Sequence, residues 1–406
     1  MPPTEPELTV VDVTDSSVRI GVLSTYPPTQ CGLATYTRAL VDGIAEVRGG
    51  IDGIGVVRVV DRIDDIPDDD PPEVVGAAIP GGPGWELAAD VLSTFDVVSV
   101  QHEYGIYGPD DGEAVVDMLK RISAPVVTTL HTVQDGPTSH RLALLRQISE
   151  LSDAVCVTSE SARRRLLSDF GLDSSKVFVV PHGAHLFAPV TPPDDRPRIL
   201  TWGLIRPGKG IEWMILGMKR LRDLQPPPLY VVAGVTHPHT VDAEGESYRR
   251  YLEGLVHRAD LGDVVEFRDE YLDDAGLARL VGEAKVVVIP YDTTDQVSSG
   301  VLIEAVGAAK PVVATDFPHA REMLASGAGM IVPHAEPAAL ADAVGRLLTD
   351  PAAYAEASAA ARRLSTHLSW PQIGRRFLDV LETVRRRAVE DSAHLSVAEE
   401  SSIHQP

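Results

Sequence analysis

The sequence has few of the features that mark secreted or membrane proteins. Its two cysteines, Cys31 and Cys156, are too few for a disulfide framework and are typical of a reducing compartment. The N-terminus is rich in proline and acidic residues, without a basic start or an apolar segment, so we expect no signal peptide. No apolar run reaches the roughly 18 residues that a transmembrane helix needs. We therefore expect a cytoplasmic protein without an integral membrane segment.

Positive charge is also scarce. The chain has 36 lysines and arginines against 59 aspartates and glutamates, which gives a formal net charge of −23. Such a surface repels phosphates of nucleic acids, so we expect no nucleic-acid partner. No group of histidines or carboxylates shows the spacing of a complete metal site, so we expect no metal. The composition leaves the oligomeric state open.

The chain instead contains a regular alternation of short apolar runs and amphipathic helical patterns. Its 406 residues, 44% hydrophobic, suit two domains of about 180 residues each. The expected strands are 18–24, 55–60, 96–100, 125–130, 154–158 and 177–180, followed by 198–202, 229–233, 264–267, 286–289, 311–314 and 330–332. The expected helices are 34–47, 85–94, 111–122, 139–151 and 160–169, followed by 210–224, 247–258, 274–283, 300–309, 318–325, 336–348, 351–363 and 371–387. Buried Val/Ile/Leu strands separated by helices predict an α/β fold with parallel sheets covered on both faces.

A proline-rich break near 188–198 divides this alternation in two. The predicted organisation is a disordered tail at 1–17, a first Rossmann-like domain at 18–190, a linker at 191–197, a second Rossmann-like domain at 198–370, a C-terminal helix at 371–387 that packs back on the first domain, and a disordered tail at 388–406. Two doubly wound sheets of this kind face each other across a cleft at the carboxyl ends of their strands, where ligands bind.

Three loops follow expected strands and open helices. The first contains Gly32, and its turn into a helix N-terminus offers free backbone N–H groups to a phosphate, although an ordinary strand-to-helix loop has the same form. It lacks the G-x-G-x-x-G pattern, so a nicotinamide cofactor is not supported. The second, from Gly203 to Gly210, carries Arg206 and Lys209. Two cations beside a helix N-terminus suit a diphosphate, although a solvated basic loop has the same composition.

The third loop, rich in Ser, Thr and Asp, leads into a helix that begins at about Gly300. Ser298, Ser299 and the backbone of Gly300 and Val301 would form an anion-binding helix start. Glu304 lies one turn inside that helix. Its carboxylate can accept hydrogen bonds from a ribose diol, or it can simply stabilise the helix dipole.

Strand ends carry further candidates. His131 ends one strand of the first half, and His102 with Glu103 ends the preceding one, at the edge where such sheets place function. A histidine at a strand end also serves often in packing alone.

These segments together resemble those of the retaining glycosyltransferases of family 4, which have the GT-B fold. The resemblance extends from about Val18 to about Arg387. The matching pieces are the Tyr26-Pro-Pro loop with Gly32, Thr129-Leu-His131, Val157-Thr-Ser-Glu160, Val180-Pro-His-Gly183, the Lys209-Gly210 loop, the segment from Gln296 to Glu304, and Lys310-Pro-Val-Val-Ala-Thr315.

The resemblance implies a role for each of these sites. Lys209 and Arg206 would hold the donor diphosphate, and Ser299, Gly300 and Val301 its distal phosphate. Glu304, the second glutamate of an E-x7-E motif, would bind the ribose. His131 would contact the transferred sugar, with Gly32 and Leu33 under the diphosphate. The full expected set is His131, Arg206, Lys209 and Gln296 as catalytic residues; Gly32, Leu33, Gly203, Arg206, Lys209, Ser298, Ser299, Gly300, Val301 and Glu304 for the donor; and Gln30, His102, Glu103, Glu160 and His182 for the acceptor.

Three positions depart from the family pattern. Gln296 replaces the first glutamate of E-x7-E, Leu204 replaces an arginine, and Cys31-Gly32 replaces a glycine pair. A bacterial subgroup of the family that carries glutamine at the first of these positions has similar segments. Since glutamine carries no charge, we expect Gln296 to orient the hexose through hydrogen bonds.

The predicted function is therefore metal-independent, retaining transfer of a mannosyl or glucosyl unit. The donor would be a nucleoside-diphosphate sugar, the acceptor a carbohydrate or small molecule, and no cofactor is expected. The alternatives are a nucleotide-sugar-binding protein without activity, a sugar-nucleotide epimerase and a phosphorylase of the same architecture.

Overall fold

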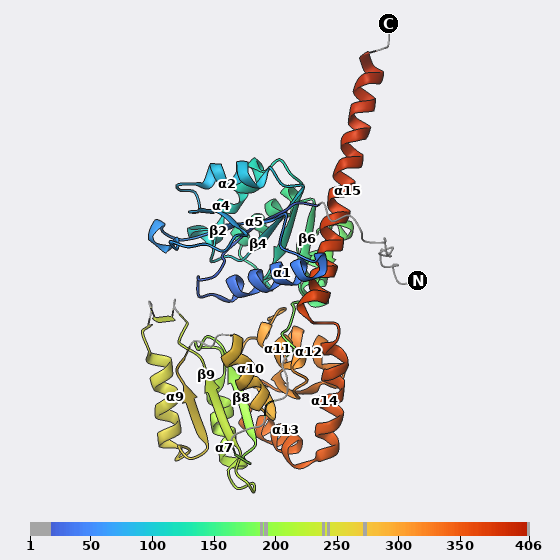
Figure 1. The fold of residues 1–406 in the computed structure, drawn as a ribbon. Helices are drawn as coiled ribbons and strands as arrows, with labels where there is room; N and C mark the ends of the chain where they lie inside the picture. The colour runs from blue at the N-terminus through green and yellow to red at the C-terminus, as the bar shows by residue number, and fades with distance from the viewer. Residues whose placement is uncertain are drawn as a thin grey trace.

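The computed structural model describes residues 18–186, 190, 194–237, 240–241, 244–270 and 274–403. The chain forms two α/β domains, one above the other in Figure 1, and a long C-terminal helix that runs along the first. The predicted tail 1–17 lies outside the described residues, as do residues 191–193 of the predicted linker 191–197 and residues 404–406 of the predicted tail 388–406.

The first domain is built on a seven-stranded parallel sheet in the order β3-β2-β1-β4-β5-β6-β7. Its strands are β1 (Ile20–Ser24), β2 (Ile54–Val59), β3 (Val74–Ala78), β4 (Val97–His102), β5 (Val126–Leu130), β6 (Ala154–Val157) and β7 (Val177–Val179). Successive residues of β1 point to opposite faces of this sheet, because Val22 packs in one core cluster and Leu23 in the other.

The second domain repeats the arrangement with a six-stranded parallel sheet in the order β10-β9-β8-β11-β12-β13. Its strands are β8 (Arg198–Trp202), β9 (Leu229–Ala233), β10 (Val265–Arg268), β11 (Val286–Ile289), β12 (Val312–Thr315) and β13 (Gly329–Val332). The strand order reverses beside β1 in the first sheet and beside β8 in the second. Such switch points open a crevice at the carboxyl ends of the strands.

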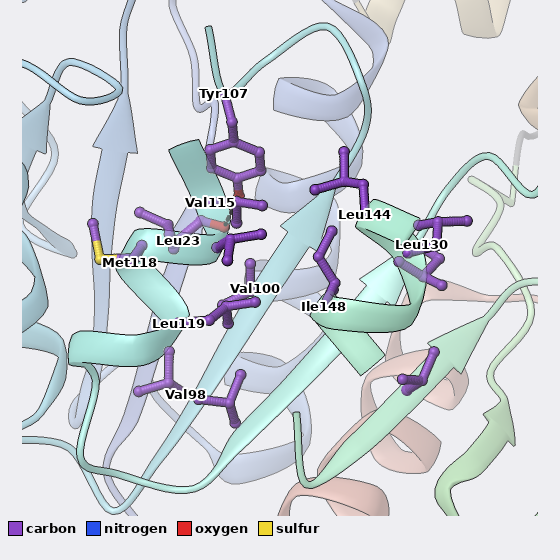
Figure 2. Packing of buried hydrophobic residues seen from close by; sticks show 14 of the residues in the cluster. Leu23, Val98, Val100, Tyr107, Val115, Met118, Leu119, Leu130, Leu144 and Ile148 are labelled. Atoms are coloured by element: carbon purple, nitrogen blue, oxygen red, sulfur yellow. Dashed lines mark hydrogen bonds between the residues drawn. The ribbon is translucent and has the colours of Figure 1, made fainter. Parts of the chain in front are cut away.

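Helices cover both faces of each sheet. The described helices of the first domain are α1 (Gly32–Arg48), α2 (Trp85–Leu92), α3 (Pro109–Gly112), α4 (Ala114–Arg121), α5 (Ser139–Leu151) and α6 (Glu160–Ser168). Those of the second are α7 (Ile211–Leu221), α9 (Ser247–Arg258), α10 (Asp274–Glu283), α11 (Gly300–Gly307), α12 (Pro318–Leu324), α13 (Pro337–Thr349) and α14 (Pro351–Ser365). In Figure 2 the side chains of α4 and α5 lie over those of β4 and β5, with Tyr107 closing one end of the cluster.

The α/β fold with two Rossmann-like sheets is confirmed, and the differences from the predicted elements are local. Strand β3 was not predicted, since it is a half-exposed edge strand containing glycine and alanine, without the Val/Ile/Leu run of a central strand. The expected helix 111–122 is divided into α3 and α4, because Asp110, Asp111 and Gly112 adopt positive φ angles of 57°, 58° and 78°.

Helix α15 (Trp370–Ile403) is longer than expected. Its helical conformation continues past Arg387 to Ile403, so the prediction of a disordered tail from 388 is wrong for that part of the chain. Its first half packs on α1, and both contribute to one core cluster with β1, in which α15 provides Trp370, Ile373, Phe377, Leu378, Val380, Leu381 and Val384. The helix thus covers a face of the first sheet that α1 alone leaves partly open.

Close approach of α1 and α15 depends on glycine. A Cβ added at Gly43 would overlap the carbonyl oxygen of Trp370, and one added at Gly374 would lie 2.6 Å from the carbonyl carbon of Gly43. Neither glycine has a positive φ, so close packing of the two backbones is what requires them.

We predict that Gly43→Ala destabilises the protein by about 1–3 kcal/mol, because the methyl group forces α15 away from α1. Urea-induced unfolding followed by circular dichroism measures the change. Gly50→Ala is the matched control, since a Cβ there meets nothing within 4 Å, and it should change stability by less than about 0.5 kcal/mol. Equal stability of the two variants would contradict the packing argument.

Candidate active site

Residues from both domains meet in one cavity of about 290 Å³ between the facing sheet edges. The first domain contributes His131 and the residues after it, which follow β5. The second contributes Arg206 and Lys209 after β8 and the loop after β11, which contains Gln296 and Ser298. The cavity lining is His131, Thr132, Val133, Gln134, Arg206, Gly208, Lys209, Tyr291, Thr293, Asp295, Gln296, Val297 and Ser298. All four predicted catalytic residues therefore lie in one cavity.

The loop after β8 owes its course to glycine. Gly203 has a φ of 116° and Gly210 a φ of 61°, both in the region that side chains avoid. A Cβ at Gly210 would also overlap the carbonyl oxygen of Pro290, so the loop after β8 packs directly on the end of β11. This contact sets Lys209 beside Tyr291.

Two cations of this loop face the cavity, and only one of them is bound to another side chain. Lys209 Nζ donates a hydrogen bond of 3.0 Å to the hydroxyl of Tyr291 and lies 4.2 Å from the centre of its ring. Arg206 is exposed, and its guanidinium group makes no ion pair or hydrogen bond with any residue that the structure describes. A fixed ammonium group and an uncommitted guanidinium group are well suited to bind a diphosphate.

The start of α11 is only partly available to a ligand. The Ser299 hydroxyl caps the helix by accepting from the N–H of Leu302, and the Ser299 N–H donates to Nδ1 of His319 at 2.8 Å. Both the hydroxyl and the N–H of Ser299, which was predicted to bind the distal phosphate, are thus already in hydrogen bonds. Within the described chain, the N–H groups of Gly300 and Val301 have no partner, and both lie in the first turn, where no helical acceptor precedes them.

Gln296 shapes the loop before this helix. Its side-chain amide donates to the backbone carbonyl of Ser298 at 2.7 Å. The backbone carbonyl of Gln296 accepts from the N–H of His319 at 3.2 Å. The remaining oxygen of the side-chain amide can accept a hydrogen bond from a ligand.

Glu304 does not line this cavity in the present structure. It is buried, and its two oxygens accept from the backbone N–H and from Nδ1 of His185, both at 3.0 Å. The two oxygens that are predicted to bind the ribose are therefore bound to His185 here. His185 lies in the first of the two segments in which the chain crosses between the domains, residues 181–186 and 366–370, which we call the hinge.

His131 is held by a chain of two hydrogen bonds through Gln101. Gln101 donates through Nε2 to Ser99 at 2.9 Å, which directs Gln101 Oε1 toward His131 Nε2, also at 2.9 Å. Nε2 of His131 must then carry the proton. Burial, followed by the nearby His182 and His102, lowers the pKa of His131 to about 3. The ring is neutral at neutral pH and acts as a hydrogen-bonding group.

The predicted acceptor-binding residues do not form one group. His102 is fully buried between Tyr104 and Tyr107, and its ring nitrogens have no hydrogen-bond partner in the described part of the chain. This burial contradicts the prediction that His102 contacts the acceptor. Glu103 lies behind the cavity, where it accepts from the hydroxyl of Thr132 at 2.7 Å, and burial raises its pKa.

The other three lie outside the cavity lining. Gln30 is exposed on the loop before α1, and Glu160 begins α6 and pairs with Arg163 at 3.8 Å. His182 lies in the segment between the domains, with its ring 5.0 Å from that of Tyr36. Gly32, Leu33 and Gly203 likewise lie outside this cavity, although a Cβ at Gly32 would meet nothing within 4 Å, so the first turn of α1 is open to close approach.

Sequence reasoning missed the contacts that join the two domains at this site. The carboxylate of Glu322, on α12, accepts from the N–H groups of Glu160 and Ser161 at 3.0 and 2.9 Å and thereby caps α6 of the first domain. Ser159 donates to the carbonyl of Val297 at 2.6 Å, and Thr158 to the hydroxyl of Ser298 at 2.9 Å. No local sequence pattern predicts such pairs, since each joins residues more than a hundred positions apart.

No group of three or more His, Cys, Asp or Glu side chains among the described residues could hold a metal ion. In the same part of the chain, no helix has the length and apolar character needed to cross a membrane.

Two glycosyltransferase family models match successive parts of the chain. A model of Glycosyltransferase Family 4 matches residues 54–186, and a model of Glycosyl transferases group 1 matches residues 183–364. The sheets, their order and these matches define a GT-B fold of the glycosyltransferases.

Individual relatives agree with this class. The chain is 29% identical to a D-inositol 3-phosphate glycosyltransferase of Kineococcus radiotolerans, over 67% of this chain and 68% of that one. It is 28% identical to a phosphatidyl-myo-inositol mannosyltransferase of Mycobacterium leprae, over 66% and 69%. The Anabaena protein HepE, solved in complex with UDP-glucose, has the same fold with a TM-score of 0.71 at 14% identity, over 90% of this chain and 99% of that one.

We predict that the free energy of unfolding falls as the pH is lowered, because the buried histidines are protonated less readily in the folded chain than in the unfolded one. Burial lowers the pKa of His102 from 6.5 to about 4, so below pH 6.5 the unfolded chain binds a proton that the folded chain does not. The stabilisation is complete above pH 6.5 and is lost progressively toward pH 4, by about 2 kcal/mol per histidine between pH 7.5 and 5.0.

Urea unfolding at these two pH values measures the loss. His102→Phe keeps the ring between two tyrosines but removes the titrating group, so its loss should be smaller by about 2 kcal/mol. The exposed His367→Ala should behave as the wild type. An unchanged loss in His102→Phe would contradict the assignment.

Proposed function

We propose that this protein is a retaining hexosyltransferase that moves a mannosyl or glucosyl unit from a nucleoside-diphosphate sugar to a carbohydrate or small-molecule acceptor, in the cytoplasm and without a metal ion. One observation carries the proposal: His131 from the first domain lines the same cavity as Arg206, Lys209 and Gln296 from the second. The inositol-phosphate and mannosyl activities named for its relatives are consistent with a hexosyl donor and a polyhydroxylated acceptor.

The donor diphosphate is assigned to the loop after β8 and the start of α11. Arg206 and Lys209 supply two positive charges at the cavity wall, and the N–H groups of Gly300 and Val301 supply two further donors. These groups stabilise the charge that develops on the leaving diphosphate as the bond to the sugar breaks. The guanidinium group of Arg206 loses no hydrogen bond within the protein on binding, since it has no partner among the described residues.

Retention follows when the acceptor oxygen attacks the anomeric carbon on the face that the diphosphate leaves. The bond from that carbon to the diphosphate oxygen breaks as the new glycosidic bond forms, and the departing oxygen takes the acceptor's proton, so no protein nucleophile is needed. Neutral His131 neither accepts nor donates a proton at neutral pH, since its pKa is lowered to about 3. It is assigned to orient the sugar together with Gln296, so the protein contributes positioning and electrostatic stabilisation.

Loss of Lys209 tests the proposal. We predict that Lys209→Ala lowers kcat/KM for the donor by about 100-fold, because it removes a cation from the leaving group. A thermal-shift series with UDP, GDP and ADP first identifies the base, since a ligand at 100 times its Kd stabilises by about 2.7 kcal/mol. Release of nucleoside diphosphate from the corresponding sugar nucleotides is then followed with and without acceptor.

Lys285→Ala is the matched control. Lys285 also lies over a tyrosine ring, 3.6 Å from the centre of Tyr354, but outside the cavity lining, so its removal should leave kcat/KM unchanged. Nucleotide binding without sugar release in wild type would indicate a binding protein, and phosphate-dependent release of sugar phosphate would indicate a phosphorylase. Equal background rates in wild type and Lys209→Ala would exclude a transferase at this site.

A second prediction concerns Gln296. In Gln296→Glu the amide that donates to the carbonyl of Ser298 becomes a carboxylate facing that oxygen, so the loop before α11 loses a bond and gains a repulsion. We therefore expect donor KM to rise by about tenfold with no rise in kcat. Steady-state kinetics on the donor measures both constants. A large rise in kcat would mean that a carboxylate is what the site lacks.

A further inference from the structure

The contact between Glu304 and His185 joins the second domain to the segment that connects the domains. Glu304 lies on α11, one turn past the N-terminus that faces the cavity, and only 8% of the residue is exposed. Its Oε2 accepts the backbone N–H of His185, and its Oε1 accepts from Nδ1 of the same residue, both at 3.0 Å. One residue thus binds both oxygens of a buried carboxylate.

A carboxylate in this position needs such donors. Removing it from water costs several kcal/mol unless hydrogen bonds replace those lost to solvent. An ionised carboxylate offers about four acceptor positions, of which His185 takes two. The other two can accept the two hydroxyls of a vicinal diol, while the contacts to His185 fix the plane of the carboxylate.

The backbone around His185 is held by contacts with both domains. The preceding residue, Ala184, donates its N–H to the carbonyl of Leu368 at 2.6 Å, in the second segment that crosses between the domains. A Cβ at Gly307 would overlap the side chain of Ala184, so α11 packs directly against this segment. The ring of His185 lies 6.3 Å from that of Trp370. The carboxylate of Glu304 is therefore anchored to the hinge rather than to its own helix alone.

We propose that His185 is a positioning residue that holds the Glu304 carboxylate in place for the ribose diol of the donor nucleotide. This inference rests on the proposed function, in which Glu304 binds the ribose. It assigns the affinity for the ribose to a pair of residues, one of them in the hinge, so ribose recognition depends on how the two domains are joined.

The test compares a nucleoside diphosphate with its 2′,3′-dideoxy form, which lacks the diol, by isothermal titration calorimetry. UDP is used first, then GDP and ADP if UDP does not bind. We expect His185→Ala to weaken binding of the ordinary nucleotide about tenfold, or about 1.4 kcal/mol, and to leave binding of the dideoxy form unchanged. His185→Asn, which places an amide N–H near the position of Nδ1, should restore most of the affinity.

Two controls separate the possible results. His367→Ala replaces an exposed histidine in the second crossing segment and should bind both nucleotides as the wild type does. Thermal denaturation of each variant shows whether the fold is kept. An equal loss for both nucleotides in His185→Ala, or no loss for either, overturns the positioning role while leaving the proposed function standing. Failure of wild type to bind any of the three nucleoside diphosphates overturns the proposed function, and this inference with it.

Discussion

The packing of Trp370 at the hinge is the interaction on which the rest of the structure depends. The chain crosses between the domains twice, and Trp370 lies where the two crossings meet. Its ring occupies the space that a side chain at Gly183 would need, and its backbone lies against Gly43 of α1. Because Tyr36 and His182 also pack on this ring, at 5.3 Å each, one side chain ties both crossings to the first domain.

That anchoring explains how two separate sheets can share one site. Parallel strands place all their carboxyl ends at one edge, so each domain presents its loops in a single direction. The cavity forms only if the two edges face each other. Helix α15 holds them there, because it leaves the second domain at Trp370 and buries its first half against α1.

The loop that is assigned to the donor is also held from the opposite domain. Arg165, on α6, donates to the carbonyl oxygens of Val133 at 2.6 Å and Asp295 at 3.1 Å, so one guanidinium group joins a cavity-lining loop from each domain. Ser159 and Glu322 add contacts across the same boundary. The position of Gln296 therefore depends on the relative placement of the domains, which makes the site sensitive to any movement between them.

The amino-acid sequence by itself determined most strands of the two sheets and the loops that follow them, because these depend on local periodicity and on turn residues after each strand. The four predicted catalytic residues, which all line the cavity, came from the resemblance of those loops to the glycosyltransferase family. Only the tertiary structure decided the rest. Strand β3 forms because β2 pairs with it, His102 is buried because two tyrosines enclose it, and Glu304 is bound because His185 contacts it from the hinge. The pairing of β3 joins separate strands, and the contact between Glu304 and His185 joins residues 119 positions apart. The burial of His102 cannot be told from the sequence, because a buried histidine and an exposed one look the same there. Such contacts arise from long-range packing, which leaves no periodic signal in the chain.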